Sequence, residues 1–109
     1  MNKLIKDTLS PLGIPVSLQC YNGSETTYIT FFSYLDKGEL YADDEEIATG
    51  NYIQIDIFSK GNYTNIVKKV KKLMKDAGFI KKASGPELYE TDTKLYHKPL
   101  RFFFYEENN

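Results

Sequence analysis

Residues 48–78 decide the fold and read ATGNYIQIDIFSKGNYTNIVKKVKKLMKDAG. In the first part of this stretch isoleucine stands at every second position, at Ile53, Ile55 and Ile57. This period of two predicts a strand over 48–59 whose aliphatic face lies against a core. Gly61 interrupts the pattern, and Asn62 is a suitable cap for a following helix. The stretch is therefore a strand joined to a helix by a short turn.

The second part of the stretch has the period of a helix. Its apolar residues fall on one side of a helical projection: Ile66, Val67, Val70, Leu73, Met74 and Ala77. This stripe predicts an amphipathic helix over 63–77. Gly78 is suited to end it, because glycine readily takes the left-handed conformation that follows many helices. Lysine occupies much of the other side of the helix.

The residues before this unit predict a second helix and two further strands. An amphipathic helix is expected over 2–12, and strands over 16–20 and 28–35, the latter rich in β-branched and aromatic residues. Asn-Gly at 22–23 is the strongest short turn signal in the chain and predicts an antiparallel hairpin between the two strands. The polar, acidic segment 36–46 is expected to be a loop.

The residues after the main helix predict the remaining strands. A strand is expected to begin over 79–82, and 88–91 with 98–105 resemble a closing hairpin. In the last strand one face is apolar, formed by Leu100, Phe102 and Phe104. The tail over 106–109 is expected to fray.

These elements predict one α+β domain spanning 1–109. A chain of 109 residues can bury one core but not two. Its 41% hydrophobic and 27% charged residues are typical of globular proteins and exclude a disordered body. A mostly antiparallel sheet with two helices packed on one face satisfies the expected order α-β-β-β-α-β-β.

Charge and cysteine content indicate the surroundings of the chain. Fourteen Lys and Arg against fifteen Asp and Glu leave a net charge of −1, with no excess to attract nucleic acid or an anionic membrane. Cys20 is the single cysteine, so no intramolecular disulfide can form, which favours a reducing compartment. The first residues lack the apolar core of a signal peptide, and no stretch approaches the roughly 18 apolar residues of a membrane span. A cytoplasmic protein is expected.

Few residues are suited to catalysis or metal binding. A metal site needs several ligands at workable spacing, and the chain has one histidine and one cysteine. His97 is interpreted as an ordinary polar residue at a strand edge, and Cys20 as a small buried hydrophobe. No Ser/His/Asp, Cys/His or paired-carboxylate arrangement stands out. We therefore expect no enzymatic activity, with no catalytic residue, cofactor or metal ion.

Two charged clusters each allow two interpretations. The carboxylates at 43–46 form either a solvated loop or an acidic contact for a basic partner, and they lack the ligand spacing of a calcium loop. The helix lysines form either a solvated outer face or a phosphate-binding stripe. No glycine-rich phosphate loop precedes that helix.

Aromatic content is the unusual feature of the composition. Nine Tyr and seven Phe make up 15% of the chain. A buried Tyr needs a hydrogen-bond partner for its hydroxyl, so nine are difficult to bury together. Surplus Tyr either marks a protein interface or covers the exposed faces of strands, and both interpretations stay open.

Six short stretches follow one another in an order that is similar to a known family. They are YADDEEIAT at 41–49, QIDIFSKGNY at 54–63, AGF at 77–79, LYE at 88–90, DTKLYHK at 92–98 and LRF at 100–102. Together they resemble the small tail-completion or tail-terminator (head-tail joining) proteins of long-tailed phages and Gram-positive prophages. The resemblance covers most of the chain after about residue 14 and rests on order more than on any single motif.

The resemblance implies a structural protein of the virion, present in the host cytoplasm during assembly. Such proteins are sandwich-like α+β domains that form a ring, often a hexamer, at the head-proximal end of the tail tube. The ring caps the tube and joins the tail to the head, so the implied partners are other copies of the chain and other tail and head-connector proteins. No membrane is implied, and nucleic acid only passes through the ring.

Ring closure requires two different patches on each subunit that meet head to tail. The acidic and lysine clusters are the candidates for these opposite patches. The candidate protein-interface residues are Tyr41, Asp43, Asp44, Glu45, Glu46, Lys68, Lys69, Lys71, Lys72 and Lys75.

Two other functions remain as alternatives. One is a small regulatory or inhibitory module that binds a cellular partner as a monomer or dimer. The other is a nucleic-acid-binding module that uses the lysine helix, and its binding would fall steeply with added salt. Concentration-dependent ring formation would separate a tail protein from the regulatory module.

Overall fold

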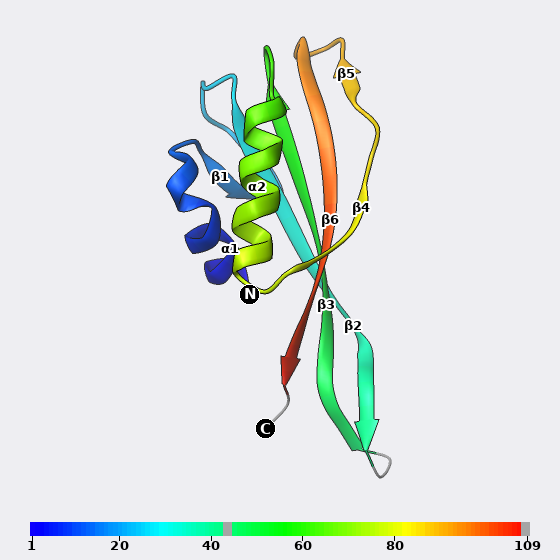
Figure 1. Cartoon of the computed structure of the whole chain (residues 1–109). Coiled ribbons are helices and arrows are strands. Elements are labelled where there is room, and N and C mark those ends of the chain that lie inside the picture. The colour runs from blue at the N-terminus through cyan, green and yellow to red at the C-terminus, as the bar shows by residue number, and fades with distance from the viewer. Residues whose placement is uncertain (43–44, 108–109) are drawn as a thin grey trace.

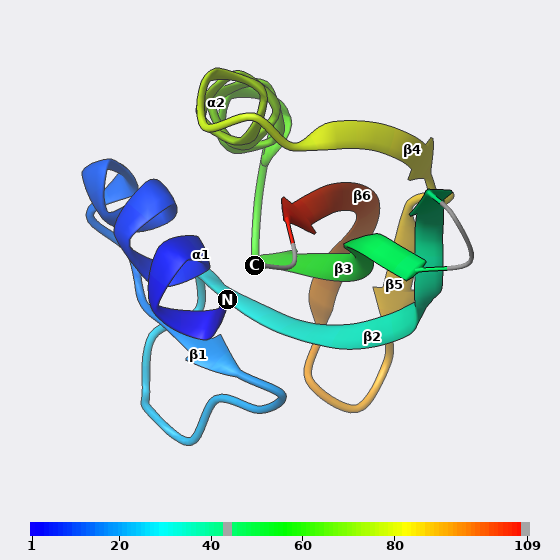
Figure 2. The ribbon, with the colours of Figure 1, turned by 90° about the horizontal axis from the view of Figure 1, so that it is seen from below.

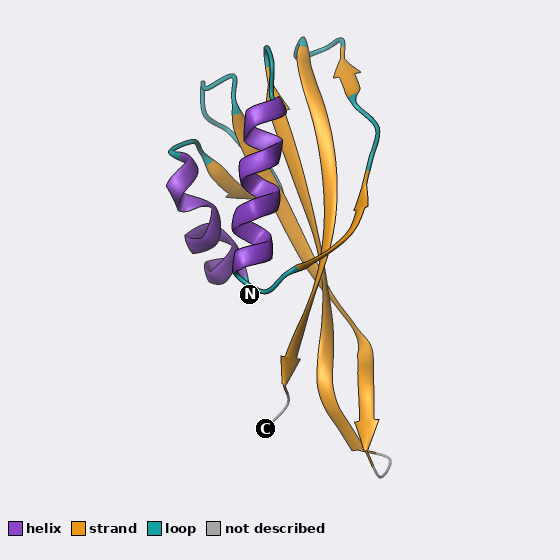
Figure 3. Cartoon of the chain, viewed as in Figure 1, coloured by secondary structure: helices purple, strands orange, loops and turns teal. Residues whose placement is uncertain are grey.

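The computed structural model describes residues 1–42 and 45–107. In chain order its elements are α1 (Asn2–Leu9), a short 3-10 helix η1 (Ser10–Leu12), β1 (Val16–Leu18), β2 (Tyr28–Ala42), β3 (Glu45–Ser59), α2 (Thr64–Asp76), β4 (Ile80–Ser84), β5 (Leu88–Glu90) and β6 (Leu95–Glu107). Within these residues, two α-helices accompany one six-stranded, mostly antiparallel sheet (Figure 3). The predicted α+β class is confirmed.

The strands follow the order β1-β2-β3-β6-β4, with β5 also paired to β6. Three strands follow α2. The sequence predicted strand segments at all three places, although the expected order for the whole chain counted two. β4 and β5 lie one after the other along the same edge of β6, from Ile80 opposite Phe103 to Glu90 opposite Leu95. The predicted closing hairpin is therefore confirmed, with the segment at 79–82 continuing into an edge strand.

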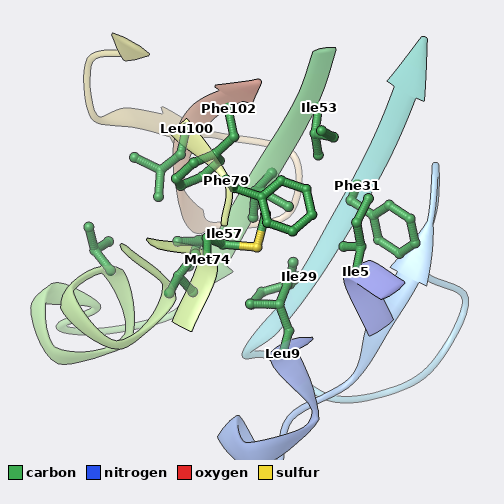
Figure 4. Packing of buried hydrophobic residues seen from close by; sticks show 13 residues of the cluster. Ile5, Leu9, Ile29, Phe31, Ile53, Ile57, Met74, Phe79, Leu100 and Phe102 are labelled. Carbon is green, nitrogen blue, oxygen red and sulfur yellow. The ribbon is translucent and has the colours of Figure 1, made fainter. Parts of the chain in front are cut away.

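The core lies between the two helices and one face of the sheet. Figure 4 shows Ile5 and Leu9 of α1 and Met74 of α2 pointing toward the strand residues. The predicted aliphatic face of β3 is confirmed, since its three isoleucines are at most 1% exposed. The sheet residues in this cluster are Ile29, Phe31, Ile53, Ile55, Ile57, Leu100 and Phe102. Phe103, on the opposite face of β6, is also buried.

The end of α2 follows the sequence prediction closely. Gly78 has a φ of 97°, and its amide donates to the carbonyl of Lys75 while the amide of Phe79 donates to that of Met74. This pair of bonds satisfies the last carbonyls of the helix. At the other end, the Asn62 side chain accepts a bond of 2.9 Å from the Thr64 amide, although Tyr63 holds the cap position.

The predicted hairpin around Asn22-Gly23 is wrong. β1 pairs with β2 in parallel, with Val16 opposite Ile29. The chain turns at Gln19, whose φ is 64°, and returns through residues 19–27 to start β2 beside the start of β1. The loop folds around Tyr21, whose hydroxyl accepts a hydrogen bond from the Glu25 amide. A strong local turn signal is thus overridden by contacts within a longer loop.

The predicted loop over 36–46 is also wrong. β2 continues to Ala42 and β3 begins at Glu45, with shifts in register after Leu35. We call residues 36–42 and 45–49 the arm, because they project beyond both helices (Figure 1). Alternating polarity reports burial of one sheet face, so a ribbon outside the core carries no such pattern. Asp43 and Asp44 lie outside the described residues.

The arm gives the molecule its shape. The chain extends 52 Å along its longest axis and 25 and 24 Å along the others. Seen along the long axis, both helices lie along one side of a strongly twisted sheet (Figure 2). The last part of β6 runs beside the base of the arm, pairing as far as Ala48 opposite Glu107. One end of the protein is therefore a packed body and the other a projecting hairpin.

Candidate protein interface

The lysines of α2 lie on the side away from the core but form two groups. Lys68, between the groups, is exposed. Lys69 and Lys72 border a hollow beside η1, and Lys72 forms an ion pair of 2.9 Å with Asp76. Lys71 and Lys75 lie on the side of β4. The predicted lysine face therefore consists of two groups on different sides of α2, one toward η1 and one toward β4.

The second group borders a cavity between α2 and β4. We call this cavity, of about 390 Å³, the α2–β4 groove. Phe79 and Phe102 form the floor of the groove, since both are buried, and the half-exposed Ile80 lies beside them. The other lining residues are Lys71, Lys75 and Lys81. An apolar floor with cationic walls is suited to an apolar side chain accompanied by negative charge.

Positive charge is concentrated at this groove. Partial burial lowers the pKa of Lys71, and the charges of Lys81 and Lys98 lower it further. Among the described residues, Lys71, Lys75 and Lys81 form no ion pair, in contrast to Lys72. Lys98 donates a hydrogen bond to the carbonyl of Gly85. Lys81 and Lys98 were absent from the predicted set, because only the pairing of β4 with β6 brings them to α2.

The described residues of the acidic cluster lie at the other end of the molecule. Tyr41 in β2 is opposite Glu46 in β3, and Glu45 is the first residue of β3. These residues stand at the far end of the arm, away from α2 (Figure 1). The structure therefore does not bring the two predicted patches together within one chain.

The sheet face opposite the helices carries a row of aromatic rings. Tyr21 stacks on Tyr28 at 4.4 Å between ring centroids, Tyr28 on Phe58 at 4.8 Å, and Phe58 on His97 at 4.3 Å. The row ends in a hydrogen bond, because Nε2 of His97 lies 2.7 Å from Oδ1 of Asp56. The interpretation of His97 as a strand-edge residue is wrong, since it pairs with β3 on one side and β5 on the other.

Cys20 and the tyrosines were also considered in the sequence analysis. Cys20 is exposed, so its interpretation as a buried hydrophobe is wrong. It follows the turn at Gln19 and has therefore left the sheet. Several tyrosines cover strand faces through ring contacts. Tyr89 and Tyr105 also make such contacts, with Tyr96 and Phe103, but are still 53% and 43% exposed and remain available to a partner.

A polar hollow lies at the end of the body opposite the arm. It is lined by residues of the β3–α2 turn together with Glu87 and Tyr96. Partial burial and a hydrogen bond with Glu87 raise the pKa of Tyr63 to about 12. A tyrosine held neutral beside a carboxylate ties the start of α2 to the segment before β5.

No described group of three or more His, Cys, Asp or Glu residues is placed to hold a metal ion. Within the same residues, neither helix is long and apolar enough to cross a membrane.

The fold is shared with a protein of known structure. The chain resembles a component of the virion of a native gene transfer agent (GTA) particle, with a TM-score of 0.62 and 12% identity. The similarity covers 93% of this chain and 84% of the other. No protein-family model matches the sequence, and no curated protein matches it. At this identity the comparison establishes a common fold.

Proposed function

We propose that this protein is a structural component of a phage-like particle, where it caps the tail tube as a ring and joins the tail to the head. The observation that carries the proposal is the shared fold with a gene transfer agent virion protein over 93% of the chain. The family resemblance of the sequence points to the same class of particle. We infer a non-enzymatic role, since a virion protein of this kind acts through its contacts.

The distribution of charge supports assembly into a ring. A closed ring needs two different surfaces on each subunit. Glu45 and Glu46 in the arm and the lysines of α2 and β4 are different in sign, and the described part of the arm lies away from α2. These two surfaces are therefore suited to meet between copies. The proposal includes a hexameric ring of this chain, with the tail tube and the head connector as its partners.

Fractionation of particles tests the proposal. Particles released from cells that carry the gene are purified on a density gradient, and the chain is detected with an antibody. We expect the chain to sediment with intact particles and with free tails. A chain found only among unassembled proteins would contradict the proposal and favour the regulatory module.

A further inference from the structure

The α2–β4 groove combines an apolar floor with positively charged walls. Its floor is apolar, formed by Phe79 and Phe102, and Ile80 beside it is 48% exposed. Its walls carry Lys71, Lys75 and Lys81. An occupant that suits both properties has an apolar side chain next to carboxylates.

Charge repulsion in the groove is not relieved by any carboxylate of the described residues. Partial burial lowers the pKa of Lys71, and the positive charges of Lys81 and Lys98 lower it further. None of the three groove lysines has a carboxylate partner among the described residues. Like charges this close repel, so binding an anionic group relieves a cost already present in the free protein.

The end of the arm has the matching chemistry. In the sequence the run Asp43-Asp44-Glu45-Glu46 follows Tyr41-Ala42 and is followed by Ile47. It is the densest cluster of carboxylates in the sequence. The described residues of the arm lead away from α2 and β4 of their own chain (Figure 1). A second copy can supply the acidic run.

We propose that the α2–β4 groove of one copy receives the acidic end of the arm of the next copy. An apolar side chain of the arm packs on Phe79 and Phe102, and carboxylates of the arm pair with Lys71, Lys75 and Lys81. This inference rests on the proposed function and adds the acceptor site to it. The contact is heterologous, because arm and groove are different surfaces, and its repetition closes a ring. Lys68, Lys69 and Lys72 take no part in it.

Cysteine crosslinking in purified particles tests the contact directly. In a Cys20→Ser background, Ile47→Cys on the arm is combined with Ile80→Cys on the groove, and the particles are treated with a short thiol crosslinker. We expect a ladder of covalent oligomers on a denaturing gel. The matched control combines Ile47→Cys with Lys69→Cys, on the other side of α2, and is expected to stay monomeric.

The outcomes separate this inference from the proposed function. Particles that contain the chain but give equal crosslinking at positions 80 and 69 would overturn the groove contact and leave the virion role intact. Absence of the chain from the particles would overturn both.

Charge reversal provides a second test that does not depend on cysteines. Lys81→Glu, made in the full chain, is expected to raise the concentration needed for ring formation, or to lower particle yield, by roughly tenfold or more. Lys82→Glu is the control, since Lys82 lies over Phe103 and does not line the groove. Combining Lys81→Glu with Glu45→Lys and Glu46→Lys is expected to restore assembly in part. Equal effects of Lys81→Glu and Lys82→Glu would contradict the inference.

Discussion

Nε2 of His97 lies 2.7 Å from Oδ1 of Asp56, and the pair joins two neighbouring strands on the sheet face opposite the helices. The Asp56 side chain is 11% exposed and also accepts bonds of 3.0 and 3.1 Å from the Gln54 amide. The His97 ring stacks on Phe58. A nearly buried carboxylate is thus held by two donors, and one of them is also part of an aromatic row.

Replacement of His97 is expected to destabilise the fold. In His97→Ala the Asp56 carboxylate keeps only the Gln54 amide, and an underpaired buried group costs about 1–3 kcal/mol. Urea unfolding measures the change in the free energy of unfolding. His97→Phe separates the two roles, because it keeps a ring on Phe58 but removes the hydrogen bond. Wild-type stability of His97→Phe would show that the bond contributes nothing.

Truncation of Ile55 is expected to have a larger effect. Its side chain is fully buried in the core, so Ile55→Ala leaves a cavity and costs about 2–5 kcal/mol. Leu88→Ala is the matched control, because Leu88 is 45% exposed, and we expect its change to stay within about 0.5 kcal/mol. Comparable losses from the two variants in thermal or urea unfolding would contradict the position of the core.

Gly85 is expected to tolerate no side chain. It lies at the break between β4 and β5, where its amide donates to the Pro99 carbonyl at 2.9 Å. A Cβ on Gly85 would lie 2.4 Å from Cγ of Pro99, which forces backbone or ring to move. Gly85→Ala is therefore expected to cost about 1–3 kcal/mol in urea unfolding. Gly61→Ala is the control, since a Cβ there meets nothing within 4 Å.

If the Gly85 and Gly61 variants unfold at the same urea concentration, the close approach of Gly85 to Pro99 is wrong. The approach also explains the break in the edge strand. Proline has no amide hydrogen to donate, so the ladder between β6 and its edge strands is interrupted at Pro99, whereas β6 stays paired with β3 there, opposite Asp56.

Tyr63 is expected to make stability depend on alkaline pH. Its pKa is raised to about 12 in the folded chain from its ordinary value of 10.0. Between these values the unfolded chain loses the proton first, so the free energy of unfolding falls as pH rises through this window and is unaffected below it. Tyr63→Phe removes this contribution. Unfolding by urea at about pH 9 and about pH 11 measures it.

The comparison needs a second tyrosine variant, because other tyrosines also ionise in this range. Tyr89→Phe is suitable, since Tyr89 is 53% exposed. It is expected to keep the pH dependence of the wild type. A loss of stability with pH that is equal in the Tyr63 and Tyr89 variants would contradict the role of Tyr63.

Sequence patterns predicted the parts of the fold that bury a surface. The alternating isoleucines of β3, the apolar stripe of α2 and the end of α2 at Gly78 all follow from burial or from local backbone preference. The arm was missed because it projects from the core and leaves no hydrophobic pattern. The parallel pairing of β1 with β2 was missed because the nearby Asn-Gly dipeptide favours a tight hairpin turn, which the longer loop between the strands does not form.

The candidate site was predicted only in part, for a similar reason. Lys71 and Lys75 were among the predicted interface residues and line the groove. Lys81 and Ile80 complete it from another strand, and their closeness to α2 is a tertiary property. Likewise, His97 and Asp56 are 41 positions apart in the chain, and only the register of β3 with β6 brings them together.

The central claim is that the chain caps a tail tube and joins it to a head. Electron microscopy of lysates tests it most directly, using a strain whose copy of the gene has an early stop codon and the same strain with the intact gene restored on a plasmid. The proposal predicts overlong headless tubes if the chain ends tube growth, or tails of normal length beside full, unattached heads if it acts in joining. Intact infectious particles at the wild-type yield would contradict it.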